Sequence, residues 1–305
     1  MRLLEHGYSV NTTVRPDPEH KRDTNFLTSL TGASQRLQIF DADLSDPCSF
    51  EAAIEGCIGV FHVATPVDFG KNEAEEVVTK RAIDGTLGIL KACLKFKTVK
   101  RVVYTSSASA VALNGKDLDL MDESFWSDVD FIRSMKSFLG PYMISKTLTE
   151  KAALQFAKEH GLDLVTLIPS FVIGPFICPK FPSSVNATLA MILGNQEVYS
   201  LMLNTSMVHV DDVARAHIFL LEYPDAKGRY ICSSDTITLE QMSEYLSTKY
   251  PEYAIPTIES LKEIKGVKAP GLSSKKLLDS GFRYKYGLDE MFDGAIQCCK
   301  EKGYL

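Results

Sequence analysis

Hydrophobic positions in the first half of the chain alternate between two spacings. Short apolar runs, of the length expected for strands buried on both faces of a parallel sheet, occur at Tyr8–Arg15, Leu37–Asp43, Gly59–Ala64, Val99–Ser106 and Leu164–Pro169. Between them, apolar residues recur at helical spacing, as at Ile83, Leu87, Leu90 and Leu94. Such alternation predicts parallel βαβ units and hence an α/β fold with a Rossmann-type doubly wound parallel sheet.

Capping residues indicate where some of the helices begin and end. Ser45–Pro47 places a capping residue before a proline, which predicts a helix that ends near Gly56. A longer helix is predicted from about Tyr142 to His160, and Gly161 is a suitable residue for its C-terminal end. The predicted apolar stripe of that helix is Leu148, Ala152 and Phe156.

The alternation of strands and helices stops after Pro169. Turn-forming residues follow, then a predicted helix near Thr188–Leu193. Thr238 and Gln241 form a capping-box pattern, which predicts a helix as far as Lys249. We therefore expect an NADP-binding Rossmann domain over 1–170 and a mainly substrate-binding subdomain over 171–305.

The first residues of the chain match the end of a helix better than the beginning of a fold. A dinucleotide-binding unit opens with a strand, a glycine-rich turn and a helix facing the pyrophosphate. Met1–Gly7 has the pattern of that helix's end with a capping glycine, and no glycine-rich loop precedes it. The sequence predicts that the first strand and its phosphate loop are missing. The alternative is that Tyr8–Arg15 is the first strand of the fold.

Composition narrows the function classes. The chain has 33 basic and 39 acidic residues among 305, a net charge of −6, which disfavours nucleic-acid binding. No apolar run reaches the length of a membrane span, and the N-terminus lacks a signal peptide pattern. The seven cysteines are scattered and contain no metal-binding spacing. We expect a cytoplasmic protein with no disulfide framework, no metal and no membrane span.

Tyr142 and Lys146 form a Y-x-x-x-K pattern, which places both side chains on one helix face. A neighbouring Lys⁺ favours tyrosinate, so the hydroxyl can take part in proton transfer near neutral pH. Two other matches occur, at 223–227 and 245–249. Only Tyr142 follows a strand that ends in serines, and Ser107 could there orient a substrate carbonyl and stabilise a developing alkoxide.

Residues at two other strand ends indicate the cofactor. In Rossmann folds a basic residue after the second strand suits the 2′-phosphate of NADP, and here Arg15 occupies that position with Arg22 nearby. The alternative is a solvated cation. Asp43 and Leu44 close the next predicted strand and could border the adenine, although Asp43 also suits the start of a helix.

These residues belong to longer segments that resemble the extended short-chain dehydrogenase/reductases, in particular the plant dihydroflavonol 4-reductase group. The resemblance covers the chain from Leu3 onward. The matching segments are Asn11–Arg15, Ala42–Leu44, Gly59–Pro66, Tyr104–Ser107, Asp122–Asp128, Tyr142–Lys146 and Val208–His217.

The resemblance implies NADPH-dependent reduction of a ring ketone on a flavonoid- or isoflavonoid-type substrate. Tyr142 would donate the proton, Lys146 would lower the pKa of the tyrosine, and Ser107 would hold the carbonyl. The implied cofactor-binding residues are Arg15, Arg22, Asp43, Leu44, Val63, Ala64, Thr65, Tyr142, Lys146, Pro169, Ser170, Phe171, Val172 and Ser184. The implied substrate contacts are Ser107, Ala112 and Tyr142, in a protein expected to be a monomer.

The sequence departs from the family pattern in two places. Ala112 stands where dihydroflavonol reductases commonly carry an asparagine that reads ring hydroxyls, so a different flavonoid skeleton is favoured; the alternative is a small packing residue. The missing glycine-rich loop leaves a second hypothesis, a truncated form with impaired cofactor binding. A nucleotide-sugar epimerase of the same superfamily is a third.

Overall fold

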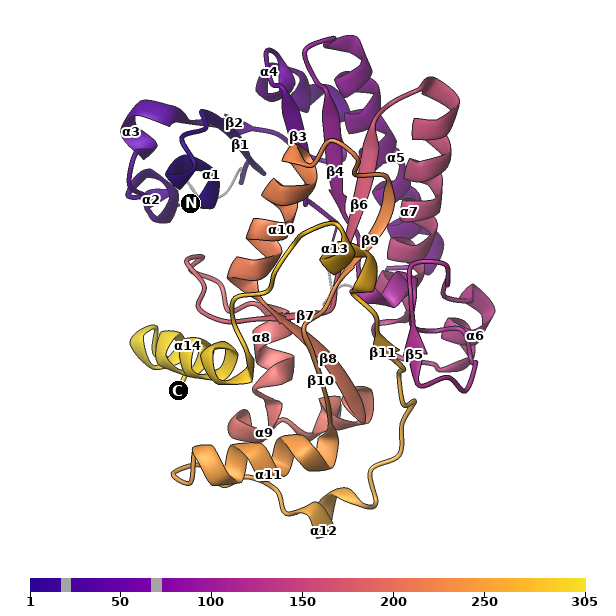
Figure 1. Ribbon diagram of the computed structural model, residues 1–305, viewed down its shortest axis with the longest axis vertical. Helices are drawn as coiled ribbons and strands as arrows, with labels where there is room; N and C mark the ends of the chain where they lie inside the picture. The colour runs from indigo at the N-terminus through magenta and orange to yellow at the C-terminus, as the bar shows by residue number, and fades with distance from the viewer. Residues whose placement is uncertain (18–22, 67–72) are drawn as a thin grey trace. The chain divides into compact units, whose positions relative to one another are not determined.

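The structure, a computed structural model, describes residues 1–17, 23–66 and 73–305. It divides into two compact units (Figure 1). The first unit comprises Met1–Ala110, Ser127–Ile168 and Ala214–Tyr230, and the second comprises Val111–Trp126, Pro169–Val213 and Ile231–Leu305. The chain leaves the first unit at Ile168, near the predicted boundary at residue 170. Two segments differ from the prediction: 111–126 belongs to the second unit and 214–230 to the first. The functional assignment of each part stays a prediction.

The strands of the first unit form two groups. One pairs β1 (Val10–Val14) in parallel with β2 (Leu37–Asp41), and the other has the order β3-β4-β6-β9, in which β3, β4 and β6 are parallel. The bounds of this second group are Gly59–His62, Arg101–Thr105, Leu164–Pro169 and Gly228–Cys232. These strands confirm the predicted Rossmann-type sheet, and β6 has the predicted bounds.

The two groups are separate sheets, since among the described residues β1 is not paired with β3. In the Rossmann strand order the first strand lies between the second strand and the fourth. The start of the chain is α1 (Arg2–Glu5), a short helix followed by Gly7 with φ +87°, as its pattern predicts. The absence of a first strand nevertheless stays a prediction.

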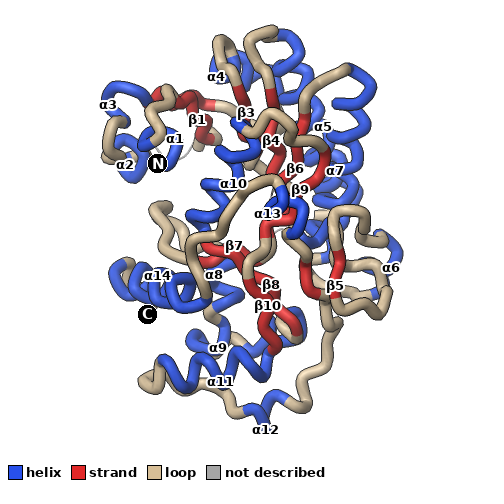
Figure 2. Tube along the Cα trace, viewed as in Figure 1, coloured by secondary structure: helices blue, strands red, loops and turns tan. Residues whose placement is uncertain are grey.

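Two long helices, α5 (Glu75–Lys95) and α7 (Gly140–His160), lie side by side along the sheet (Figures 1 and 2). Gly85 and Gly88 let α5 approach the turn after β2 closely. A Cβ at Gly85 would lie 3.0 Å from the carbonyl oxygen of Leu44, and one at Gly88 would lie 2.1 Å from Cβ of Pro47. Leu44 is thereby fixed between β2 and α5.

The remaining helices of the first unit are short, except for α10, which the chain enters from the second unit. Their bounds are α2 Asn25–Thr28, α3 Ala33–Arg36, η1 Pro47–Phe50, α4 Glu51–Ile54, η2 Ala108–Ala110, α6 Val129–Ser134 and α10 Val210–Glu222. The helix predicted after Ser45 is thus η1 followed by α4, and it ends before Gly56 as expected. Gly59 leaves room on β3 for Leu221 of α10.

The predicted apolar stripe of α7 is only partly correct. Phe156 is buried as predicted, but Leu148 and Ala152 are only partly buried. The buried face also carries Lys146 and Glu150, with Glu150 fully covered. Apolar periodicity could not locate this face because polar residues occupy much of it. The end of the helix at Gly161, in the left-handed conformation, is confirmed.

The second unit is built on the sheet β10-β8-β7 and the parallel pair β11-β5. The strand bounds are β5 Leu120–Met121, β7 Phe171–Ile173, β8 Asn204–His209, β10 Asp235–Thr238 and β11 Gly271–Leu272. The helix bounds are α8 Ser183–Thr188, α9 Ala190–Leu193, η3 Gln196–Leu201, α11 Leu239–Lys249, α12 Ile258–Leu261, α13 Lys275–Asp279 and α14 Leu288–Glu301. The capping box of Thr238 and Gln241 is confirmed.

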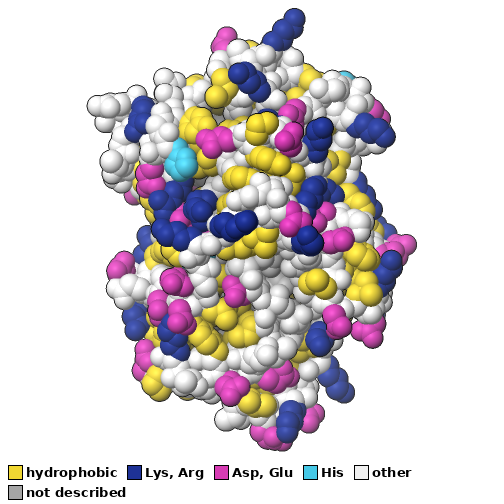
Figure 3. Space-filling view, viewed as in Figure 1, with side chains coloured by type: hydrophobic (Ala, Val, Ile, Leu, Met, Phe, Trp, Pro, Cys, Tyr) yellow, Lys and Arg dark blue, Asp and Glu magenta, His cyan; other side chains and the backbone are white. Residues whose placement is uncertain are grey.

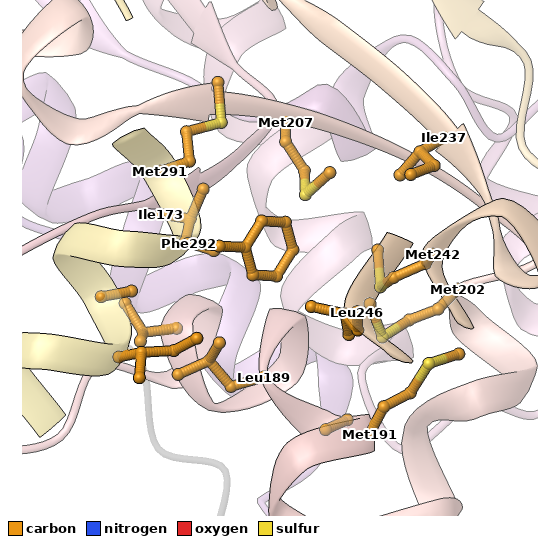
Figure 4. Close-up of a cluster of buried hydrophobic side chains, with 14 of the residues drawn as sticks. Ile173, Leu189, Met191, Met202, Met207, Ile237, Met242, Leu246, Met291 and Phe292 are labelled. Atoms are coloured by element: carbon orange, nitrogen blue, oxygen red, sulfur yellow. The ribbon is translucent and has the colours of Figure 1, made fainter. Parts of the chain in front are cut away.

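Methionine and aliphatic side chains fill the core of the second unit. Figure 4 shows the ring of Phe292 among them, including Met207 and Met242. The buried methionines of this cluster are Met191, Met202, Met207, Met242 and Met291.

Charge of both signs is distributed over the surface. Figure 3 shows basic and acidic side chains mixed over the visible face, in keeping with the modest net charge of −6. Among the helices of the described residues, none combines the length and the apolar character that crossing a bilayer requires.

Candidate active site

The first unit brings together the three residues predicted to be catalytic. Ser107 follows the carboxyl end of β4, and α7 carries Tyr142 in its first turn and Lys146 one turn later. The side chains of Tyr142 and Ser107 are hydrogen-bonded to one another. Ser107 Oγ also accepts hydrogen bonds from the backbone N–H of Ser109 at 3.2 Å and from its hydroxyl at 2.9 Å.

Lys146 links α7 to the ends of two strands. Its Nζ donates to Oγ1 of Thr65, after β3, at 2.6 Å, and to the carbonyl oxygen of Thr105, the last residue of β4, at 2.9 Å. The side chain is almost fully buried. Burial lowers the pKa of Lys146 to about 8, while the negative charge of Glu150 acts in the opposite direction. At neutral pH the ammonium group is therefore charged and held in one place.

The pKa of Tyr142 is raised from its ordinary value, because burial disfavours the phenolate, while the bond to Ser107 partly opposes this. The direction is opposite to the lowering that the Y-x-x-x-K pattern predicted from Lys146. A raised pKa keeps the phenol protonated at neutral pH, which suits a proton donor.

His62, the last residue of β3, is buried, packed and hydrogen-bonded. Its Nε2 lies 2.9 Å from Oγ1 of Thr86, and its ring packs on Tyr104. Burial and the charge of Lys146 lower the pKa of His62 to about 3. The imidazole is therefore neutral under ordinary conditions and cannot supply a proton.

The predicted adenosine-side residues follow β1 and β2. Arg15 is exposed directly after β1, and its charge contributes to lowering the pKa of Asp43. The larger causes are the backbone and side-chain hydrogen bonds that Asp43 accepts from Ser45, at 2.8 Å and 2.7 Å. Asp43 thus caps a turn and not the start of a helix, since the following helix η1 begins at Pro47 after Asp46, and the cation of Arg15 lies within its electrostatic reach. Arg22 lies outside the described residues.

The end of β3 exposes apolar groups. Val63 is 56% exposed and Ala64 is also exposed, whereas Thr65 is partly buried and bonded to Lys146. An exposed valine at the carboxyl end of a parallel strand is in the region where doubly wound sheets bind ligands.

The other predicted residues belong to the second unit. Pro169 and Ser170 are buried, and the N–H of Ser170 donates to the carbonyl oxygen of Cys232 at 3.1 Å. Phe171 and Val172 form β7 and pair with β8. Ala112 and Ser184, the latter on α8, are partly buried. Their roles toward cofactor or substrate stay predictions.

Sequence reasoning missed a buried ionic network behind the site. Glu150 of α7 pairs with Arg229 of β9, Oε1 to Nε at 3.0 Å, with side-chain exposures of 0% and 8%. The available signal was spacing, since Glu150 extends the series Tyr142, Lys146 by four more residues. The other Y-x-x-x-K match at 245–249 has no such buried network. Its Lys249 instead pairs with Asp289 and Asp293 on the surface.

Known proteins resemble the chain over nearly its full length. It is 60% identical to vestitone reductase of Medicago sativa over 303 residues, which is 99% of this chain and 93% of the relative. The crystal structure of that enzyme from alfalfa matches with a TM-score of 0.90 and 57% identity, covering 100% of this chain and 94% of that one. The likeness was predicted from Gly7–Thr13, Ile83–Cys93 and Ala295–Leu305.

Two more distant proteins are also similar to the chain, one in sequence and one in fold. The chain is 48% identical to a dihydroflavonol 4-reductase of Callistephus chinensis over 306 residues, covering 100% of this chain and 83% of the relative. A yeast methylglyoxal/isovaleraldehyde reductase complexed with NADPH has a TM-score of 0.79, covering 100% of this chain and 95% of that one, and its 24% identity supports the fold alone.

A family model described as the NAD dependent epimerase/dehydratase family matches residues 1–232. Together with the relatives, this match confirms the predicted resemblance, the Rossmann-type fold, the oxidoreductase class and a nicotinamide dinucleotide as cofactor. The chain belongs to the NAD dependent epimerase/dehydratase family, one of the short-chain dehydrogenase/reductase families.

Proposed function

We propose that the protein is an NADPH-dependent reductase of a ring ketone on a flavonoid- or isoflavonoid-type substrate, and that it acts as a cytoplasmic monomer. The observation that carries the proposal is the joint placement of Ser107, Tyr142 and Lys146. A protonated phenol, a hydroxyl bonded to it and a buried ammonium group converge at the carboxyl ends of β3 and β4.

Each of the three side chains has a separate task in the proposed reaction. Reduced nicotinamide, when bound, supplies hydride to the carbonyl carbon. Tyr142 donates its phenolic proton to the carbonyl oxygen as negative charge develops there. Ser107 donates a hydrogen bond to the same oxygen and stabilises the developing alkoxide. Lys146, fixed by Thr65 and Thr105, stabilises the phenolate that remains and would hold the nicotinamide ribose.

The residues of the first unit fit such a cofactor. Arg15 supplies an exposed guanidinium after β1, where a 2′-phosphate would be bound through paired charge-assisted hydrogen bonds. Leu44 offers an apolar surface for adenine at the end of β2. The exposed Val63 and Ala64 suit contact with the cofactor's ribose and nicotinamide side. This arrangement supports NADPH over NADH.

Sequence identity supports the substrate class. Vestitone reductase and dihydroflavonol 4-reductase, at 60% and 48% identity, are both named for flavonoid-type ketones. Ala112 cannot hydrogen-bond to a ring hydroxyl, so we favour a vestitone-like skeleton over a dihydroflavonol. A vestitone-type ketone should therefore show the higher kcat/KM, and Ala112→Asn should narrow the difference.

The first experiment is a fluorescence titration of the purified chain with NADPH and with NADH. We expect saturable binding that prefers NADPH. Arg15→Gln should weaken NADPH binding roughly 10- to 100-fold, the loss expected for charge-assisted hydrogen bonds, and leave NADH binding unchanged. The matched control is Lys97→Gln, which removes one exposed positive charge from the opposite, amino-terminal side of β4.

Two results would contradict the proposal. Equal affinity of the unmodified chain for NADPH and NADH would contradict the role proposed for Arg15. If the protein binds NADPH but no flavonoid-type ring ketone oxidises the bound NADPH, the proposed substrate class is wrong.

A further inference from the structure

Glu150 occupies an unusual position for a carboxylate. It lies in the middle of α7 with no exposed surface and accepts four hydrogen bonds. The donors are the hydroxyl of Ser106 at 2.6 Å, the hydroxyl of Thr166 at 2.7 Å, and Nε and Nη2 of Arg229 at 3.0 Å and 3.2 Å. A buried ion pair seldom stabilises a fold more than apolar residues of equal size would. The network therefore calls for another explanation.

The four bonds tie one helix to three neighbouring strands. Ser106 directly follows β4, Thr166 belongs to β6, and Arg229 belongs to β9. Nη2 of Arg229 also donates to the carbonyl oxygen of Ala110 at 3.4 Å, in the short helix after the serines. Glu150 thus fixes α7 against the carboxyl end of β4, where the site is built.

Not every buried polar side chain of α7 has hydrogen-bond partners. The hydroxyls of Ser145 and Thr149 are buried and have none among the described residues, whereas Lys146 and Thr147 are hydrogen-bonded. A full set of partners, as around Glu150, is therefore not a general property of the buried face of the helix.

Glu150 is connected to the proposed catalytic residues in two ways. Through Ser106 it holds the residue that immediately precedes Ser107. Along α7 it lies one turn beyond Lys146 and two turns beyond Tyr142, and its negative charge favours the charged form of Lys146 against burial. The other titratable groups near Lys146 are Tyr142 on its own helix, Tyr104 on β4 and His62 on β3.

We propose that Glu150, held by Arg229, is a positioning residue that sets Ser107 against Tyr142 and keeps Lys146 protonated at the working pH. The inference rests on the proposed function, since it assigns a role relative to those three residues. It does not depend on which ketone is reduced.

The test follows the titration of Lys146 itself, in the protein without cofactor or substrate. The ¹³Cε signal of labelled lysine, assigned by its loss in Lys146→Met, should titrate near a pKa of about 8 in the unmodified protein. Glu150→Gln should lower that midpoint by about one pH unit. The matched control is Glu159→Gln, which removes an exposed carboxylate from the same helix and should leave the midpoint unchanged.

If Glu150→Gln alone does not fold, a second variant still tests the proposal. The double change Glu150→Gln with Arg229→Met removes both charges of the pair and should fold with a near-normal melting temperature. Loss of the Arg229 cation by itself raises the Lys146 midpoint, so the comparison that isolates Glu150 is with Arg229→Met alone. Lys146 should titrate lower in the double variant than in Arg229→Met, and the alkaline limb of the kcat profile should move to lower pH between these two variants. Equal Lys146 midpoints in the two variants would overturn the proposal.

The two proposals fail in different ways. Loss of the expected Lys146 shift, with NADPH binding and ketone reduction intact, would contradict only the role of Glu150. A shifted Lys146 in a protein that binds no NADPH would contradict only the proposed function.

Discussion

The interior beside the candidate site differs in chemistry from the interior of the second unit. In the first unit the buried face of α7 contributes Lys146 and Glu150, and strand hydroxyls and Arg229 complete their hydrogen bonds. In the second unit the core is built around Phe292 and a group of methionines (Figure 4). One interior is defined by directional bonds between fixed partners, the other by side chains that can repack.

This difference suggests a division of physical tasks. Buried polar networks with every partner in place specify one geometry, which proton transfer between close groups requires. Methionine is unbranched and adapts to irregular shapes, so a core rich in it tolerates change. We therefore expect substitutions in the first interior to be costly and specific, and those in the second to be mild.

The largest expected effect is on activity. Tyr142→Phe removes the proposed proton donor and should lower kcat by about 10²- to 10⁴-fold, the range for a lost general acid. Because Tyr142 is only partly buried, the melting temperature should change little. Steady-state kinetics with NADPH and a ring ketone, alongside thermal unfolding, measure both. A variant that keeps more than a tenth of the normal kcat would remove Tyr142 from the reaction.

The largest expected effect on stability comes from breaking the buried ion pair on one side. Arg229→Met leaves the Glu150 carboxylate buried without its cation and should cost about 3–5 kcal/mol of unfolding free energy. Adding Glu150→Gln should recover most of that loss. Urea unfolding monitored by circular dichroism measures both variants, and equal stability of the single and the double variant would contradict the pairing.

Lys146 should reveal a conflict between stability and activity. Its pKa of about 8, against 10.5 for an exposed lysine, corresponds to ~3 kcal/mol needed to keep it charged at pH 7. Between about pH 8 and 10.5 the unfolded chain binds more protons than the folded one, so stability attributable to this group rises with pH. Below pH 8 the full cost is present.

Lys146→Met removes that cost together with two hydrogen bonds from a charged donor, to Thr65 and Thr105, each worth about 1.5–3 kcal/mol. At pH 7 the removed cost offsets much of this loss. By pH 10 the cost has fallen, so the variant should be about 2 kcal/mol less stable relative to the unmodified protein than it is at pH 7, with activity lost. Unfolding of both proteins at the two pH values measures this difference. A stability difference that is the same at pH 7 and pH 10 would show that Lys146 does not titrate in this range.

The sequence predicted the fold more fully than the site. Strand positions were visible because parallel strands buried on both faces are uninterrupted apolar runs, and β6 matched its predicted bounds. Only Phe156 of the predicted stripe of α7 is buried, because periodicity assumes that buried residues are apolar and this face carries Lys146 and Glu150. Motif and context predict Ser107, Tyr142 and Lys146, and their catalytic roles stay predictions. They do not predict the contact of Glu150 with Arg229, since 79 residues separate the two and only the fold brings them together.

The smallest expected effects come from a matched pair of conservative substitutions, one in each interior. Thr166→Val and Met242→Leu both replace a fully buried side chain with one of similar size. Thr166→Val deletes a hydrogen bond to a buried carboxylate and should cost about 1.5–3 kcal/mol. Met242→Leu changes only shape within a deformable core and should cost less than about 1.5 kcal/mol. Chemical unfolding of the two variants side by side compares the interiors directly, and a larger cost for Met242→Leu would show that the methionine core is the more tightly specified of the two.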